Sequence, residues 1–107
     1  MQPTILLVIS FLLIGCFEQP APKKKPSEAM IGASTKALTL CAGCHGPGGI
    51  SPSPDNPNLA GQKKAYLVKQ LMDFRTGKRA NSPSMTYISR LISEQEISLI
   101  SEWYSRQ

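Results

Sequence analysis

The chain has 107 residues, of which 41% are hydrophobic, and it carries 12 Lys and Arg against 7 Asp and Glu. This length allows one small domain with a modest core, and such domains are commonly completed by a disulfide, a metal or a cofactor. Three cysteines cannot all pair within the chain, which argues against a scaffold held by disulfides. The net charge of +5 favours acidic partners. We expect no nucleic-acid partner, because the basic residues are not interleaved with aromatic ones.

Residues 1–15 are predicted to be an export signal. Residues 5–14 form an apolar run that only Ser10 interrupts, about half the roughly 20 residues that a membrane-spanning helix needs. Residues 13–16, Leu-Ile-Gly-Cys, resemble the lipobox of bacterial lipoprotein signals, which implies that Cys16 carries the lipid and becomes the mature N-terminus. No Lys or Arg precedes the run, which departs from the usual export signal. The alternative is a buried N-terminal helix with an ordinary apolar cysteine.

Residues 16–27 are predicted to be the lipidated N-terminus and a linker. Residues 18–27 contain three Pro, three Lys and no large apolar side chain, so they should be extended and solvated. At about 3.1 Å per residue this segment would reach roughly 30 Å from a membrane. We interpret the lysine run, Lys23 to Lys25, as part of a solvated spacer, with contact to anionic lipid headgroups as the alternative. The protein is thus expected on the periplasmic side of a bacterial membrane, held there by its lipid.

Residues 28–107 are predicted to form one all-α domain with about three main helices. Apolar residues recur at intervals of three and four, and no segment alternates with a period of two. Gly77 stands where the second helix would end, and residues 93–96 form a capping-box pattern before the third. Long irregular loops lie at residues 46–61 and around residues 81–86, and loops of this length suggest that they wrap something. The three helical stripes are Met30, Ala33, Ala37, Leu38 and Cys41; Tyr66, Leu67, Gln70, Leu71 and Phe74; and Ile97, Ile100, Trp103 and Tyr104.

Residues 41–45 read Cys-Ala-Gly-Cys-His, the pattern of c-type haem attachment. At the end of a helix, Cys41 and Cys44 can reach the two vinyl groups on one side of a porphyrin, and His45 is then held under the iron as an axial ligand. A zinc site would need a fourth ligand, and a thioredoxin-like dithiol would need a βαβ context that is missing. A plain disulfide in a short exported domain remains an alternative, but it leaves His45 and the long loops unexplained.

The domain as a whole resembles a class I c-type cytochrome, in particular small periplasmic members and single domains of dihaem periplasmic cytochromes. The segments that carry the resemblance are CAGCHGPGG at residues 41–49, PNLAGQ at 57–62, YLVKQLMDFRTGKR at 66–79 and LISEQEISLISEWY at 91–104. The resemblance implies the class I cytochrome c fold, with long loops wrapped around one covalently bound haem c. It also implies that the carbonyl of Pro57 accepts a hydrogen bond from the distal ring nitrogen of His45.

The sixth iron ligand is expected to be Met85. Met1 would be lost with the signal, Met30 lies upstream in the first predicted helix, and Met72 lies inside the second. Met85 alone lies in a predicted loop between the second and last helices, where the family places its methionine.

Two arginines are candidates for the haem propionates. Arg75 lies near the end of the second predicted helix and Arg79 just after Gly77, and a guanidinium binds a carboxylate with two hydrogen bonds. Equally, both side chains can be solvated. Trp103 and Tyr104 are expected to belong to the core, where the last helix packs against the first.

An iron with His and Met on its two faces has no open position for a substrate, so the expected chemistry is one-electron transfer rather than catalysis. We therefore expect a membrane-anchored periplasmic electron carrier that meets redox protein partners transiently, as a monomer or as a subunit. The alternative is a dedicated cytochrome subunit of a larger periplasmic dehydrogenase or oxidase complex. A haem-based peroxidase or sensor is a third possibility.

Overall fold

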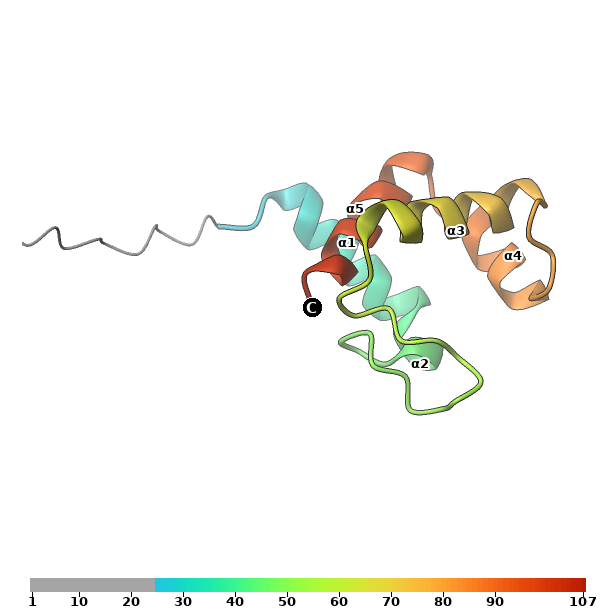
Figure 1. The fold of residues 1–107 in the computed structure, drawn as a ribbon. Helices are drawn as coiled ribbons and strands as arrows, with labels where there is room; N and C mark the ends of the chain where they lie inside the picture. Colours follow the sequence, from blue (N-terminus) through green and yellow to red (C-terminus); the bar gives the residue numbers. More distant parts are fainter. Residues whose placement is uncertain (1–24) are drawn as a thin grey trace, which may run out of the picture.

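The computed structural model describes residues 25–107, and all regular structure in this range is helical (Figure 1). The expectation of an all-α fold is confirmed. The export signal, Cys16 and the linker up to residue 24 lie outside the described residues. None of the helices between residues 25 and 107 is long and apolar enough to cross a membrane. The helices are α1 (Glu28–Leu40), α2 (Ala42–His45), α3 (Lys64–Thr76), α4 (Pro83–Arg90) and α5 (Glu94–Ser105).

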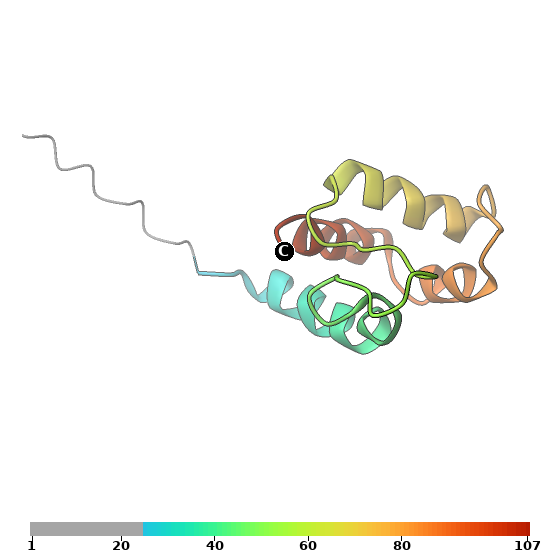
Figure 2. The ribbon, with the colours of Figure 1, turned by 60° about the horizontal axis from the view of Figure 1, so that its bottom comes forward.

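The core forms where α5 lies between α1 and α3, an arrangement that both ribbon views show (Figures 1 and 2). Ala33 and Ala37 are buried on α1, and their small side chains let the α5 backbone approach closely. Leu67 closes the cluster from α3. The cluster also contains Ile92, Ile97, Ile100 and Tyr104.

Local signals explain how the long helices begin and end. The Ser93 hydroxyl accepts a hydrogen bond from the Glu96 backbone N–H, and the Glu96 carboxylate accepts one from the Ser93 N–H, so the capping box starts α5 as the sequence predicts. Gly77 ends α3 in the left-handed conformation, with φ of 83°. These contacts involve only neighbouring residues, so they can be recognised from the sequence.

Helix α4 corrects the predicted loop at residues 81–86. Ser82 caps this helix by accepting a hydrogen bond from the Met85 N–H at 3.3 Å, and Pro83 occupies the first helical position, where its missing N–H costs nothing. Ser and Pro are also typical of loops, and packing against α3 completes α4. Met85 therefore lies in the first turn of a helix and not in a loop. With the short helix α2, the domain has two short helices beside the three long ones.

The loop after α2 folds back against the core through Gly49. Gly49 has φ of 83°, and its carbonyl accepts hydrogen bonds from the N–H groups of Leu59 at 2.7 Å and Ala60 at 3.0 Å. A Cβ here would come within 2.8 Å of both the Ala60 nitrogen and Cδ1 of Tyr104. Only glycine fits this position, and the contact fixes the end of the loop beside α5.

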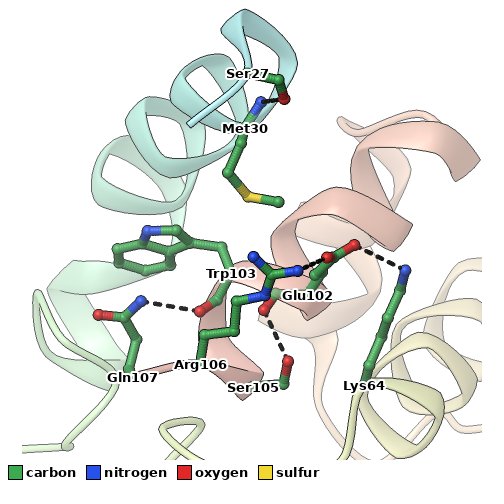
Figure 3. A network of polar contacts seen from close by, with 8 residues as sticks. All are labelled: Ser27, Met30, Lys64, Glu102, Trp103, Ser105, Arg106 and Gln107. Carbon is green, nitrogen blue, oxygen red and sulfur yellow. Dashed lines mark hydrogen bonds and ion pairs between the residues drawn. The ribbon is translucent and has the colours of Figure 1, made fainter. Parts of the chain in front are cut away.

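At the end of the domain where α1 begins, ion pairs tie α3 to α5 (Figure 3). The Glu102 carboxylate accepts from Lys64 at 3.1 Å and also from Arg106. Both basic residues, and Lys64 more than Arg106, hold the pKa of Glu102 below its usual range. All three side chains are partly exposed to solvent, so these ion pairs contribute little to the free energy of unfolding. Their main role is to position α3 against α5.

Candidate functional site

A cavity of about 500 Å³ lies at the centre of the domain. Its size falls within the roughly 300–1,000 Å³ usual for ligand sites. Cys41, Cys44, His45 and Met85 all line it, so the fold brings together residues that are up to 44 positions apart in the chain. Most of the remaining wall is apolar, which suits a large, flat, hydrophobic group. The apolar wall includes Leu40, Leu59, Leu67, Leu71, Phe74, Ile88 and Ile100.

Both thiols are presented by the junction of α1 and α2. Cys41 ends α1 and begins α2: its N–H donates to the Ala37 carbonyl at 2.9 Å, and its carbonyl accepts from the His45 N–H at 3.0 Å. Cys41 is half-buried, and burial raises the pKa of its thiol, an effect that the neighbouring Tyr104 hydroxyl partly offsets. Cys44 is exposed although it lines the cavity. One edge of the cavity therefore reaches the surface at Cys44.

His45 is held in one orientation by the loop that follows it. The side chain is 6% exposed, and Nδ1 lies 2.8 Å from the carbonyl oxygen of Pro57. A carbonyl oxygen can only accept, so Nδ1 carries the proton and Nε2 is left as the nitrogen that can bind a metal. The contact has the geometry that the resemblance implies for Pro57.

The Pro57 carbonyl is itself fixed by the neighbouring residues. The Ser51 N–H donates to Oδ1 of Asn58 at 2.7 Å, and the Ser51 hydroxyl donates to the Cys44 carbonyl at 3.0 Å. Two residues after Pro57, the Leu59 N–H donates to the Gly49 carbonyl at 2.7 Å. These bonds tie the segment that orients His45 to α2, the helix that carries Cys44.

Of the methionines in the described part of the chain, only Met85 lines the cavity. Met30 points from α1 toward α5 at the far end of the domain (Figure 3). Met72 packs against the hydrophobic core. The Met85 side chain is half-buried, and it reaches the cavity from α4, an element distant in sequence from α2.

The two candidate arginines have different surroundings. Arg75 does not line the cavity; its guanidinium donates to the carbonyls of Ser89 and Ile92 and so ties α3 to the segment between α4 and α5. Arg79 does line the cavity, with its guanidinium 4.5 Å from the centre of the Phe74 ring. Arg79 also donates hydrogen bonds to the side chains of Gln70 at 2.6 Å and Asn81 at 3.0 Å.

Tyr104 and Ser101 are among the cavity residues that were not singled out as site residues from the sequence. Tyr104 belongs to the core, as expected, but it also lines the cavity. Ser101 lines the cavity one turn earlier on α5 and is fully buried. The sequence did carry one signal for Ser101: it is a polar residue on the helix face that Ile97, Ile100 and Tyr104 make apolar.

The donor groups fit a covalently attached haem. The two thiols stand at one end of a mainly apolar cavity, and His45 presents one imidazole nitrogen that can bind iron. Within residues 25–107, no three His, Cys, Asp or Glu side chains are placed to share a metal ion by themselves. Both cysteines of the motif are free thiols, available for attachment.

Comparison with known proteins agrees with this site. The family described as Cytochrome c matches residues 30–103. The chain belongs to the cytochrome c family. A cytochrome c domain binds haem c covalently, and Cys41 and Cys44 are consistent with that attachment.

Individual relatives show how far the similarity extends. The chain is 37% identical over 79 residues to the thiosulfate dehydrogenase electron acceptor of Stutzerimonas stutzeri, covering 72% of this chain and 37% of that protein. It is 34% identical over 90 residues to the cytochrome subunit of sulfide dehydrogenase of Chlorobaculum tepidum, covering 82% and 80%.

Among solved structures, the crystal structure of reduced recombinant cytochrome c4 from Pseudomonas stutzeri matches with a TM-score of 0.64 and 29% identity. The match covers 74% of this chain and 48% of that one. The cytochrome c chain described here thus spans less than half of the cytochrome c4 chain and of the thiosulfate dehydrogenase electron acceptor.

Proposed function

We propose that this cytochrome c is a one-electron carrier whose haem is attached through Cys41 and Cys44 and ligated by His45 and Met85. The observation that supports this best is that all four side chains line one cavity, with His45 already oriented by Pro57. When bound, the haem supplies the ferric and ferrous states between which a single electron is exchanged.

The chain's own residues have distinct tasks in this proposal. Pro57 holds the proton of His45 on Nδ1, so that Nε2 stays unprotonated for the iron. The apolar wall excludes water, which lowers the solvent rearrangement that accompanies electron transfer. The exposed position of Cys44 brings an edge of the group to the surface, where a partner can exchange the electron. Arg79, on the cavity wall, is the proposed contact for a propionate, and Arg75 is not.

The ligand assignment is tested by substitution of the methionine. Met85→Leu conserves volume but removes the sulfur, so the charge-transfer band from methionine sulfur to ferric iron should disappear. Met72→Leu is the matched control, because Met72 packs against the core and does not line the cavity. Retention of the band in the Met85 variant, or its loss in the Met72 variant, would refute the assignment.

We further propose that the protein is exported to the periplasm and anchored by lipid at Cys16. The lipobox resemblance at residues 13–16 and the Pro- and Lys-rich linker after it support this. A Cys16→Ser variant should appear in the soluble fraction, whereas Ser10→Ala, which leaves the cysteine in place, should stay with the membrane. Continued membrane association of the Cys16 variant would exclude lipid as the tether.

The second candidate function is that of a dedicated cytochrome subunit of a larger dehydrogenase or oxidase complex. Two relatives are named as an electron acceptor of thiosulfate dehydrogenase and as a subunit of sulfide dehydrogenase, which favours this candidate. Co-purification with one enzyme at fixed stoichiometry after detergent extraction would support it, and migration as a monomer would support a transient carrier. Rapid carbon monoxide binding at neutral pH would favour a haem-based peroxidase or sensor instead.

A further inference from the structure

Two hydroxyl groups in the cavity wall have no hydrogen-bond partner among residues 25–107. They are Oγ of Ser101 and the phenol oxygen of Tyr104, whose residues are 0% and 1% exposed. Their positions on α5 differ by three, so both lie on the same helix face, and both residues line the cavity. Burying an unbonded hydroxyl is destabilising, and buried polar groups in folded proteins nearly always have a partner. Both groups therefore point to a ligand in the cavity.

Ser101 differs from two other helical serines, Ser89 and Ser105, in how its hydroxyl is used. A serine or threonine inside a helix commonly bonds back to a carbonyl of the preceding turn. Ser89 bonds to the Thr86 carbonyl at 3.0 Å and Ser105 to the Glu102 carbonyl at 2.7 Å, but Ser101 makes no such bond. Its hydroxyl is thus left to the cavity and not used by the helix.

Tyr104 belongs to the buried core cluster, Cys41 packs against that cluster, and both residues line the cavity. The Tyr104 hydroxyl lowers the pKa of the Cys41 thiol and has no formed hydrogen bond among the described residues. A thiol can donate and accept, whereas a thioether sulfur can only accept. Once haem is attached at Cys41, the neighbouring phenol is the group that can donate to this sulfur. Burial raises the pKa of Tyr104 well above its usual value, so the phenol keeps its proton.

We propose that the Tyr104 hydroxyl donates a hydrogen bond to the Cys41 thioether sulfur and that the Ser101 hydroxyl points its hydrogen into the cavity beside it. Together the two hydroxyl groups raise the reduction potential of the haem. The inference rests on the haem attachment proposed above and does not depend on Met85 as a ligand. Donated hydrogens place positive partial charge beside the macrocycle, which favours the reduced state because that state carries one positive charge less. The effect is strong in a buried wall, where the effective dielectric constant is low. Reduction takes one electron from a redox protein partner and moves no proton at either hydroxyl.

The test measures reduction potentials of the haem-loaded domain. Tyr104→Phe and Ser101→Ala should each lower the potential. The matched controls are Tyr87→Phe and Ser105→Ala, and both should leave the potential unchanged. Tyr87 is 64% exposed, and neither Tyr87 nor Ser105 lines the cavity. An unchanged or higher potential in the Tyr104 variant would overturn the proposal, and an unchanged potential in the Ser101 variant would remove Ser101 from it.

A vibrational measurement tests the Tyr104 bond directly, and thermal unfolding separates tuning from packing. The carbon–sulfur stretch of the attached haem should shift between H₂O and D₂O in the wild type but not in Tyr104→Phe. The Tyr104 variant should unfold at a lower temperature, because a formed bond is lost. A higher unfolding temperature together with an unchanged potential would show that the hydroxyl is unbonded in the loaded protein. Persistence of the methionine band in these variants keeps this test separate from the Met85 assignment.

Discussion

Gly49→Ala tests whether the loop that orients His45 depends on close contact with α5. Gly49 has φ of 83°, and an added Cβ would lie 2.8 Å from the Ala60 nitrogen and 2.8 Å from Cδ1 of Tyr104. Such distances are too short for real contacts, so either the loop or the ring has to move. One of the neighbours is backbone, which cannot turn aside as a flexible side chain can.

The cost of this substitution combines two effects with one small gain. A left-handed conformation costs an alanine about 1–2 kcal/mol, and overpacking a tight site adds about 1–3 kcal/mol. Alanine restricts the unfolded chain and returns about 0.4–1 kcal/mol. The expected loss is therefore about 3 kcal/mol in the free energy of unfolding, which is roughly 12–24 °C in Tm for a domain of this size.

Two other glycines separate these contributions. Gly77 has the same φ of 83° but nothing within 4 Å of its added Cβ, so Gly77→Ala should cost only about 1 kcal/mol. Gly48 has an ordinary φ and also nothing within 4 Å, so Gly48→Ala should be neutral or slightly stabilising. Guanidinium unfolding of the haem-loaded protein, followed by circular dichroism, measures all three. If Gly49→Ala costs no more than Gly77→Ala, the contact with α5 does not carry the loop, and our account of Gly49 is wrong.

Three further predictions concern the helix contacts and the cofactor. Arg75→Ala should lower the free energy of unfolding by about 3 kcal/mol, seen as a lower denaturant midpoint, because two carbonyls lose a charged donor. The hydrogen bond from Lys36, more than the bond from the Ser93 N–H, lowers the pKa of Glu96 below its usual 4.5. The Lys36–Glu96 ion pair therefore stabilises the folded state above pH 4.5, and this contribution is lost as the pH falls through the lowered pKa. Glu96→Gln retains a capping side chain, so it should reduce the free energy of unfolding at pH 7 by less than about 1 kcal/mol, and the difference from the wild type should shrink as the pH falls below 4.5. A variant with Cys41→Ala and Cys44→Ala, prepared without haem, should show no cooperative unfolding transition, and a cooperative transition would contradict the cofactor's role in the core.

Sequence reasoning works here where the signal is local. The capping box at Ser93 and the left-handed Gly77 depend on residues within one turn, and both helix boundaries could be anticipated. The spacing of Cys41, Cys44 and His45 likewise identifies the haem motif because the three residues lie in one helical stretch. The fold class follows from these signals together with the three apolar stripes.

The sequence misled where a short element depends on its neighbours. Ser82 and Pro83, which start helix α4, are also typical of loops, and packing on α3 favours the helix. Met85 was therefore expected in a loop and lies in a helical turn. The two arginines show the same limit: only the fold turns Arg75 to the α4–α5 segment and Arg79 to the cavity.

The sequence by itself determined the helical class, the three long helices and the haem-attachment motif of Cys41, Cys44 and His45, because each depends on side chains within a few positions of one another. The tertiary structure alone decided which distant groups share the cavity. It brings Met85 to the motif, orients His45 through Pro57, and places the hydroxyls of Ser101 and Tyr104 in the cavity wall. These arrangements depend on how α5 packs between α1 and α3, and no local pattern records a contact between segments that are far apart in the chain.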